Sequence, residues 1–224
     1  MALRNKKKFK KSSLGLFGLI IICIGIISIS YDYFLSKKEN AFITMNIKLF
    51  ESETPEIASS EDYIDPEEET PDNTSNPQEE IPKKPKVTYN YVGILEIPKI
   101  NLKQGFLDIN SKYNNVDYNI TVIQTSTYPD EEGGNFILAS HSGNSYISYF
   151  RNLYQLSEGD EAYIYYNNIK YKYNIVKIYN VEKNGKVAIY RNYNATCLTL
   201  ITCTKDSETE QTVYILELTD KEQY

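Results

Sequence analysis

The sequence predicts a mainly β domain, folded as a closed β-barrel or a β-sandwich, behind an apolar N-terminal segment and a charged linker. Three observations support this fold class. Residues 14–29 are almost entirely apolar, residues 37–88 are rich in acids and prolines, and short apolar runs separated by turn residues begin at Tyr91. Regularly spaced short strands are typical of barrels and sandwiches, and closure is favoured because it removes exposed strand edges.

The N-terminal segment has the features of a membrane anchor. A basic cluster at positions 4–11 precedes the apolar run, which approaches the ~20 residues needed to cross a bilayer once it is extended to residue 35. Because basic clusters stay on the cytoplasmic side, we expect a cytoplasmic tail at 1–13, a transmembrane anchor at 14–35 and an extracellular remainder. A cleaved signal peptide is the alternative, since the Ser-Ile-Ser triplet at 28–30 is of the kind that signal peptidase accepts.

Residues 36–88 are expected to form an extracellular acidic, proline-rich linker. So many charges and prolines cannot bury enough apolar surface to offset the entropy lost on ordering. We therefore expect a disordered or extended stalk, with a possible short element at 41–50. A compact domain then occupies 89–224.

Within this domain the pattern predicts seven strands and one helix. The expected strands are 93–97, 119–124, 135–140, 162–166, 170–179, 197–202 and 212–218. Asn167-Asn168 is a plausible hairpin turn between two of them. Apolar residues recur at helical spacing over 146–156, which predicts a helix there.

The charge distribution argues against nucleic acid as a partner. The chain has a formal net charge of −6, and its basic residues form no cluster outside the first dozen positions. The acids at 130–132 are interpreted as ordinary loop charges rather than metal ligands. We expect no cofactor and no metal.

Three cysteines, Cys23, Cys197 and Cys203, are present. Cys23 lies in the apolar run. Cys197 and Cys203 lie six positions apart, so on one extended strand they are ~20 Å apart, whereas a disulfide needs Cα atoms within ~7 Å. At least one thiol is therefore free, and a free thiol outside the cytoplasm calls for an explanation.

Cys203 and His141 together indicate nucleophilic catalysis. Cys203 ends a predicted strand, and the single histidine, His141, follows another strand and is flanked by small residues. A thiol becomes an effective nucleophile when a nearby group takes its proton, and histidine is the usual partner. Either residue alone is weak evidence, but the pair at two strand ends is a candidate active site.

The residues around this pair resemble the sortase family. Residues 199–203 read Thr-Leu-Ile-Thr-Cys, which matches the family's nucleophile motif, and 137–143 match the segment around its histidine. Residues 93–100 look like the family's opening strand. The resemblance covers about 89–220 and implies an eight-stranded barrel with one or two short helices, on the outer face of a Gram-positive cell.

The resemblance also implies a reaction and its partners. Sortases are cysteine transpeptidases, grouped with the thiol proteases among hydrolases. They cut a Leu-Pro-x-Thr-Gly-like sorting signal of a secreted protein between Thr and Gly and hold the upstream part as a thioester. The thioester then passes to an amine of cell-wall peptidoglycan or of a pilin subunit.

The resemblance implies site residues for this sequence, and all but one of the family's site residues are present. Cys203 is the expected nucleophile, His141 the acid and base, and Thr202 a weaker candidate for orienting substrate or contributing its backbone to an oxyanion site. The family's arginine on the following strand is missing, because 204–224 contains no arginine. Gln211 stands at its position, or Glu210 if the register slips by one. Lys205 or Arg191 could supply the charge from another direction.

Two other functions remain open at this point. One is a catalytically silent surface module that keeps a peptide-binding groove without turnover, as the missing arginine suggests. The other is a cysteine peptidase that passes the same thioester to water.

Overall fold

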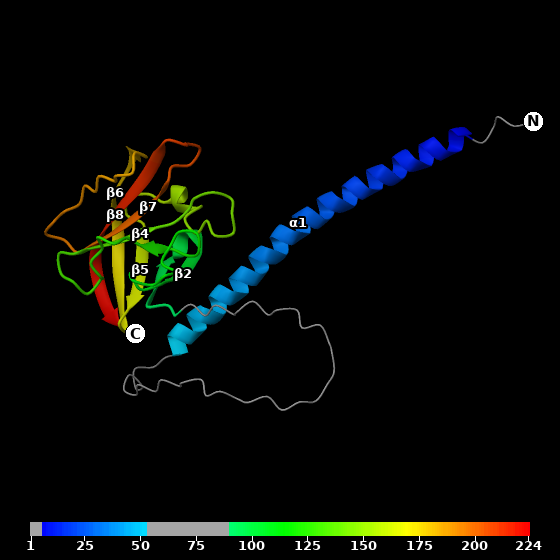
Figure 1. Ribbon diagram of the computed structural model, residues 1–224. Helices are drawn as coiled ribbons and strands as arrows, with labels where there is room; N and C mark the ends of the chain where they lie inside the picture. The colour runs from blue at the N-terminus through cyan, green and yellow to red at the C-terminus, as the bar shows by residue number, and fades with distance from the viewer. Residues whose placement is uncertain (1–5, 53–89) are drawn as a thin grey trace, which may run out of the picture. The chain divides into compact units, whose positions relative to one another are not determined.

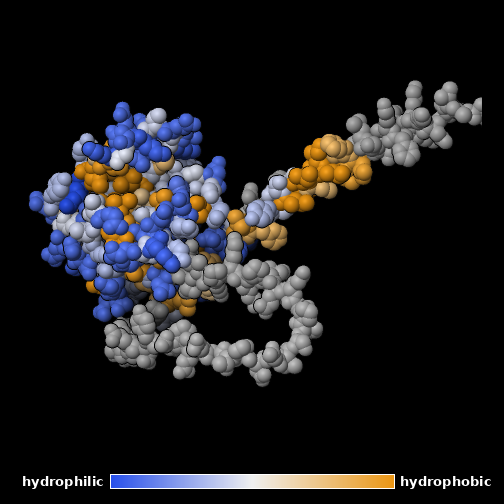
Figure 2. Space-filling view, viewed as in Figure 1, coloured by the Kyte–Doolittle hydropathy of each residue, from blue (hydrophilic) through white to orange (hydrophobic). Residues whose placement is uncertain are grey.

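The computed structural model describes residues 6–52 and 90–224, which form a long helix and a β-domain (Figure 1). The helix α1 spans Lys6–Ser52 and is 47 residues long. It contains an 18-residue window with a mean hydropathy of 2.0, so it is long and apolar enough to cross a membrane by length and composition. The large apolar side chains that are described between Leu16 and Phe34 are exposed, as the orange surface in Figure 2 shows.

The helix continues through 36–52, where we expected the stalk to begin. These residues are helical rather than extended, and the short element considered at 41–50 is part of α1. Local composition allows this, because residues 36–52 contain no glycine or proline and the prolines begin only at 55. The rest of the predicted linker, 53–88, lies outside the described residues.

The β-domain is an eight-stranded, nearly closed barrel, as expected. In the sheet the strands follow the order β2-β1-β5-β6-β8-β7-β4-β3. A bridge between Phe106 and Ile120 joins the β2 edge to the segment that enters β3. The strands are β1 (Gly93–Ile97), β2 (Leu102–Phe106), β3 (Thr121–Val122), β4 (Asn135–Ala139), β5 (Glu161–Tyr166), β6 (Ile169–Glu182), β7 (Cys197–Cys203) and β8 (Glu210–Gln223).

One face of each central strand supplies the barrel core. Leu198 and Leu200 of β7 are fully buried, and their partners Leu216 and Tyr214 on β8 lie in the same cluster. Because successive side chains alternate between faces, the odd-numbered residues of β7 point the other way. This alternation decides which face of the barrel carries Cys203.

The hairpin between β5 and β6 turns where the sequence predicts. Asn167 and Asn168 connect the paired residues Tyr166 and Ile169, and their φ angles are 50° and 58°. A two-residue turn that matches the twist of its strands needs positive φ at both positions, which asparagine tolerates.

The strand β2 is absent from the sequence prediction. Lys103 and Gln104 give it little apolar character, and Gly105 weakens the strand pattern. The glycine is needed because a Cβ at this position would lie 2.1 Å from the ring of Tyr91. The close packing of Tyr91 therefore requires glycine at position 105, although glycine has a low β propensity.

The helix predicted over 146–156 is wrong. The segment forms successive turns in which Ser148, Arg151 and Leu153 each bond to the carbonyl three residues earlier. The amide of Phe150 donates instead to the carbonyl of His141, which draws the chain back toward β4. Only a short 3-10 helix, η2 (Leu153–Gln155), remains, and a second one, η1 (Pro98–Ile100), follows β1.

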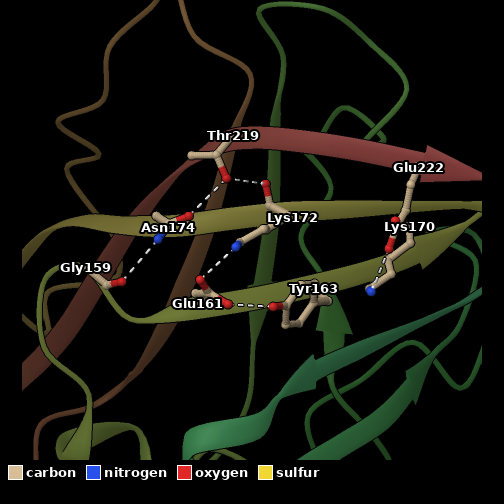
Figure 3. Close-up of polar contacts among 8 residues, drawn as sticks. All are labelled: Gly159, Glu161, Tyr163, Lys170, Lys172, Asn174, Thr219 and Glu222. Carbon is tan, nitrogen blue, oxygen red and sulfur yellow. Dashed lines mark hydrogen bonds and ion pairs between the residues drawn. The ribbon is translucent and has the colours of Figure 1, made fainter.

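The outer face of β5, β6 and β8 is joined by polar contacts between strands (Figure 3). Glu161 accepts hydrogen bonds from Tyr163 at 2.5 Å and pairs with Lys172 at 2.7 Å. Lys170 and Glu222 form a second ion pair at 2.8 Å. These oppositely charged side chains pair across neighbouring strands and so stabilise the register in which the strands pair.

Candidate active site

The two predicted catalytic residues lie at neighbouring strand ends. β4 and β7 run parallel, with Ala139 beside Ile201, so both strands end at the same edge of the sheet. The amide of Ser140 extends this pairing by donating to the carbonyl of Ile201 at 3.3 Å. His141 follows Ser140, and Cys203 is the last residue of β7, so both residues lie where these two neighbouring strands end.

His141 and Cys203 are also both partly exposed. Leu200 and Thr202 point into the barrel and are buried, so Cys203 points away from it and is partly exposed. His141 lies two residues beyond the end of β4, and 43% of its side chain is exposed. Both side chains are therefore accessible at the edge where β4 and β7 end.

Ser142 fastens the segment after β4 to the end of β7. Its hydroxyl donates to the backbone carbonyl of Cys203 at 2.9 Å. The following loop is held by Arg151, whose guanidinium donates to the carbonyls of Ser145 and Ser148. The position of His141 is thus set by hydrogen bonds on both sides of it.

Asp117 is a site residue that the sequence reasoning missed. Its carboxylate oxygen lies 3.4 Å from Nε2 of His141, and its own amide donates to Asn115 Oδ1 at 2.9 Å. Its side chain is 70% exposed. No local pattern identifies this aspartate, because it lies in an irregular loop 24 residues before the histidine.

Gln211 lies directly opposite Cys203 in the antiparallel ladder of β7 and β8. The adjacent amide of Thr204 donates to the carbonyl of Glu210 at 3.0 Å, which makes Cys203 and Gln211 a non-hydrogen-bonded pair. Side chains of such pairs share a face and approach most closely, with Cα atoms about 4.5 Å apart. Glu210 has the opposite parity, so Gln211 is the β8 residue beside the thiol.

The side chain of Thr202 faces the barrel interior. It is 5% exposed, and its hydroxyl donates to the carbonyl of Ser140 at 2.8 Å. This hydrogen bond joins the ends of β7 and β4 below the site. The side chain is therefore unable to contact a peptide on the outer face, and only the Thr202 backbone remains available for that role.

The two cations suggested as substitutes for the missing arginine are engaged elsewhere. Nζ of Lys205 lies 3.8 Å from the ring centroid of Tyr154. Arg191 donates to the carbonyls of Gly133 at 3.0 Å and of Ala195 at 3.3 Å, near the opposite end of β7. A different cation, Lys183, approaches the thiol, with Nζ 3.8 Å from Sγ of Cys203.

Cys197 and Cys203 occupy opposite ends of one strand and do not pair with each other, as the spacing predicted, and both thiols are free. Cys197 is fully buried, and burial raises the pKa of its thiol. Such a thiol is a small apolar core side chain. Cys203 is the cysteine of β7 that solvent and substrate can reach.

Comparison with known proteins shows the family and the fold of this chain. The family model for the sortase domain matches residues 95–218. No curated protein matches the sequence. A Clostridium perfringens sortase D5 transpeptidase has a similar structure, with a TM-score of 0.50 and 23% identity over 58% of this chain and 80% of that one.

Two further solved structures are similar. Listeria monocytogenes sortase A has a TM-score of 0.51 and 22% identity, over 60% of this chain and 90% of that one. Sortase C-1 from Actinomyces oris has a TM-score of 0.52 and 20% identity, over 58% of this chain and 72% of that one. At these identities the likeness concerns the fold.

Proposed function

Because the chain belongs to the sortase family of cysteine transpeptidases, we propose that it cleaves an LPxTG-like sorting signal of a secreted protein through a Cys203 thioester. It then transfers the upstream fragment to an amine of peptidoglycan or of a pilin subunit. The observation that supports this most directly is the parallel pairing of β4 and β7, because the two strands end at the same edge of the sheet and lead into His141 and Cys203.

The proposed reaction has two half-steps. Sγ of Cys203 attacks the scissile carbonyl carbon, and the carbon–nitrogen bond breaks while His141 donates a proton to the leaving amine. The acyl group is then held as a thioester. An acceptor amine attacks this thioester, His141 accepts its proton, and the sulfur leaves with the bonding electron pair.

Gln211 and Asp117 have supporting roles in this proposal. The amide of Gln211, beside the thiol, donates a neutral hydrogen bond to the developing oxyanion. Asp117 has a carboxylate oxygen 3.4 Å from Nε2 of the imidazole and is a positioning residue for His141. Thr202 is a positioning residue as well, since its hydroxyl ties β7 to β4.

The helix α1 supports an extracellular location for the catalytic domain. At 1.5 Å per residue, its 47 residues extend about 70 Å, more than twice the ~30 Å of a bilayer core. We propose that its apolar part crosses the membrane once, with the basic N-terminus inside. The remaining turns then lie beyond the membrane and begin the connection to the barrel.

The full-length chain in detergent micelles tests the enzymatic reading. Incubation with Leu-Pro-x-Thr-Gly peptides should add the mass of the upstream fragment to Cys203, located by peptide mapping, and Cys203→Ala should remove this adduct. Adding glycine-based and lysine-based amines then separates transfer from hydrolysis. If the wild-type chain forms no thioester with any of several signals, the protein is better described as a catalytically silent peptide-binding module. The missing arginine favours this alternative.

A further inference from the structure

The end of β6 brings a positive charge to the reacting sulfur. Lys183 follows β6 directly, and its Nζ lies 3.8 Å from Sγ of Cys203. The two residues are 20 positions apart in sequence and belong to strands separated by β8. Nothing in the motif around Cys203 predicts this contact, because it depends on the pairing of β6 with β8 and of β8 with β7.

The barrel scaffold holds Lys183 in this place. The amide of Lys183 donates to the carbonyl of Thr209 at 2.7 Å, which continues the β6–β8 pairing by one residue. Two residues earlier, Val181 pairs with Gln211, which in turn pairs with Cys203. Lys183 has the parity of Val181, so its side chain rises on the face that carries Cys203.

The charge beside the thiol is thus supplied by a residue whose backbone is fixed. Lys205 interacts with Tyr154, and the Arg191 guanidinium is bonded to backbone carbonyls some six residues along β7, or ~20 Å, from the nucleophile. Gln211, the nearest β8 residue, is neutral. Among these four candidates, Lys183 is the cation in contact with the sulfur.

We propose that Lys183 is a catalytic residue, whose ammonium stabilises the negative charge carried first by Sγ of Cys203 and then by the oxygen of the tetrahedral intermediate. In this role Lys183 acts through its charge and forms or breaks no bond. Preorganised positive charge next to developing negative charge is a large contribution to catalysis. This inference rests on the proposed function, because it assigns a role within the same acyl transfer.

Paired alkylation reagents test the charge without requiring turnover. Iodoacetate is an anion and iodoacetamide is neutral, so a cation beside the sulfur selectively accelerates the first. In the full-length chain in detergent, we expect Lys183→Gln to lower the ratio of the two Cys203 alkylation rates about fivefold, the factor that one unit charge at ~4 Å produces through water. Lys183→Arg should retain the ratio. Lys186→Gln, which removes a lysine of the next loop, should retain it as well.

Thioester formation then tests the catalytic role. Lys183→Gln should slow formation of the Cys203 thioester by about 10- to 100-fold, with partial rescue by Lys183→Arg and an unchanged melting temperature. An unchanged alkylation ratio in Lys183→Gln would overturn the proposal, as would normal thioester formation. A wild-type chain without a thioester would overturn the proposed function, and the alkylation ratio would still report the charge beside Cys203.

Discussion

The side chain of Ser142 donates a hydrogen bond to the backbone carbonyl of Cys203 at 2.9 Å. It links the loop that carries the histidine to the strand that carries the nucleophile. The relative position of the two proposed catalytic residues, Cys203 and His141, therefore depends on a contact that takes no part in the proposed reaction.

Removal of this contact should loosen the site. Ser142→Ala loses one hydrogen bond of about 1 kcal/mol, so thioester formation should slow about fivefold. Ser142→Thr keeps the hydroxyl and should stay near the wild-type rate. The comparison uses the initial rate of Cys203 thioester formation, and equal rates in the two variants would contradict a positioning role.

Thr202 should affect stability rather than substrate affinity. Thr202→Val is similar in shape but leaves the buried carbonyl of Ser140 without its donor, which costs about 1–3 kcal/mol of unfolding free energy. Urea unfolding of the full-length chain measures this loss. If Thr202 bound substrate through its hydroxyl instead, KM would rise while the unfolding midpoint stayed constant.

Gln211 should contribute one neutral hydrogen bond to the transition state. Gln211→Leu is expected to slow thioester formation about 2- to 10-fold, whereas Gln211→Arg adds a charge beside Cys203 and should accelerate it. Glu210→Gln is the matched control, because Glu210 points to the other face of β8. A larger effect at Glu210 than at Gln211 would show that the catalytic register is shifted by one residue.

Asp117 should have a modest, salt-dependent effect. Its carboxylate and His141 are largely exposed, and exposed pairs contribute about 0.2–1 kcal/mol. Asp117→Asn should therefore slow thioester formation up to about fivefold at low salt, and the difference should shrink at 1 M salt. A loss of 100-fold would instead assign Asp117 a direct catalytic role.

Acid stability should depend on Asp108. The amide of Asn110 and the hydroxyl of Tyr128 donate to this carboxylate and hold the pKa of Asp108 below its ordinary value. A lowered folded-state pKa stabilises the protein above the unfolded value of about 4, and this contribution disappears as pH falls through the folded value.

Asp108→Asn should therefore lower the melting temperature most at pH 7 and progressively less toward pH 3. Circular dichroism melts across this range measure the difference between variant and wild type. A difference that stays constant with pH would mean that the carboxylate charge contributes nothing to stability.

The sequence by itself determined the fold class, most strands and the ends of β4 and β7. Alternating apolar residues identify buried strands, and the turn at Asn167-Asn168 is encoded by its own residues. The same reasoning failed for β2, where Gly105 packs under Tyr91. It also failed for 146–156, where the amide of Phe150 donates to the carbonyl of His141. In both places a distant partner overrides local propensity.

The tertiary structure alone decided which residues surround Cys203. Asp117 comes from an irregular loop, Gln211 is fixed by the register of β8, and Lys183 reaches the sulfur across that strand. The pairing and register of strands are set by burial of the whole sheet, and a shift of one residue would reverse every face. Cys203 and His141 can therefore be proposed from the sequence alone, whereas the charges around them follow from strand pairing.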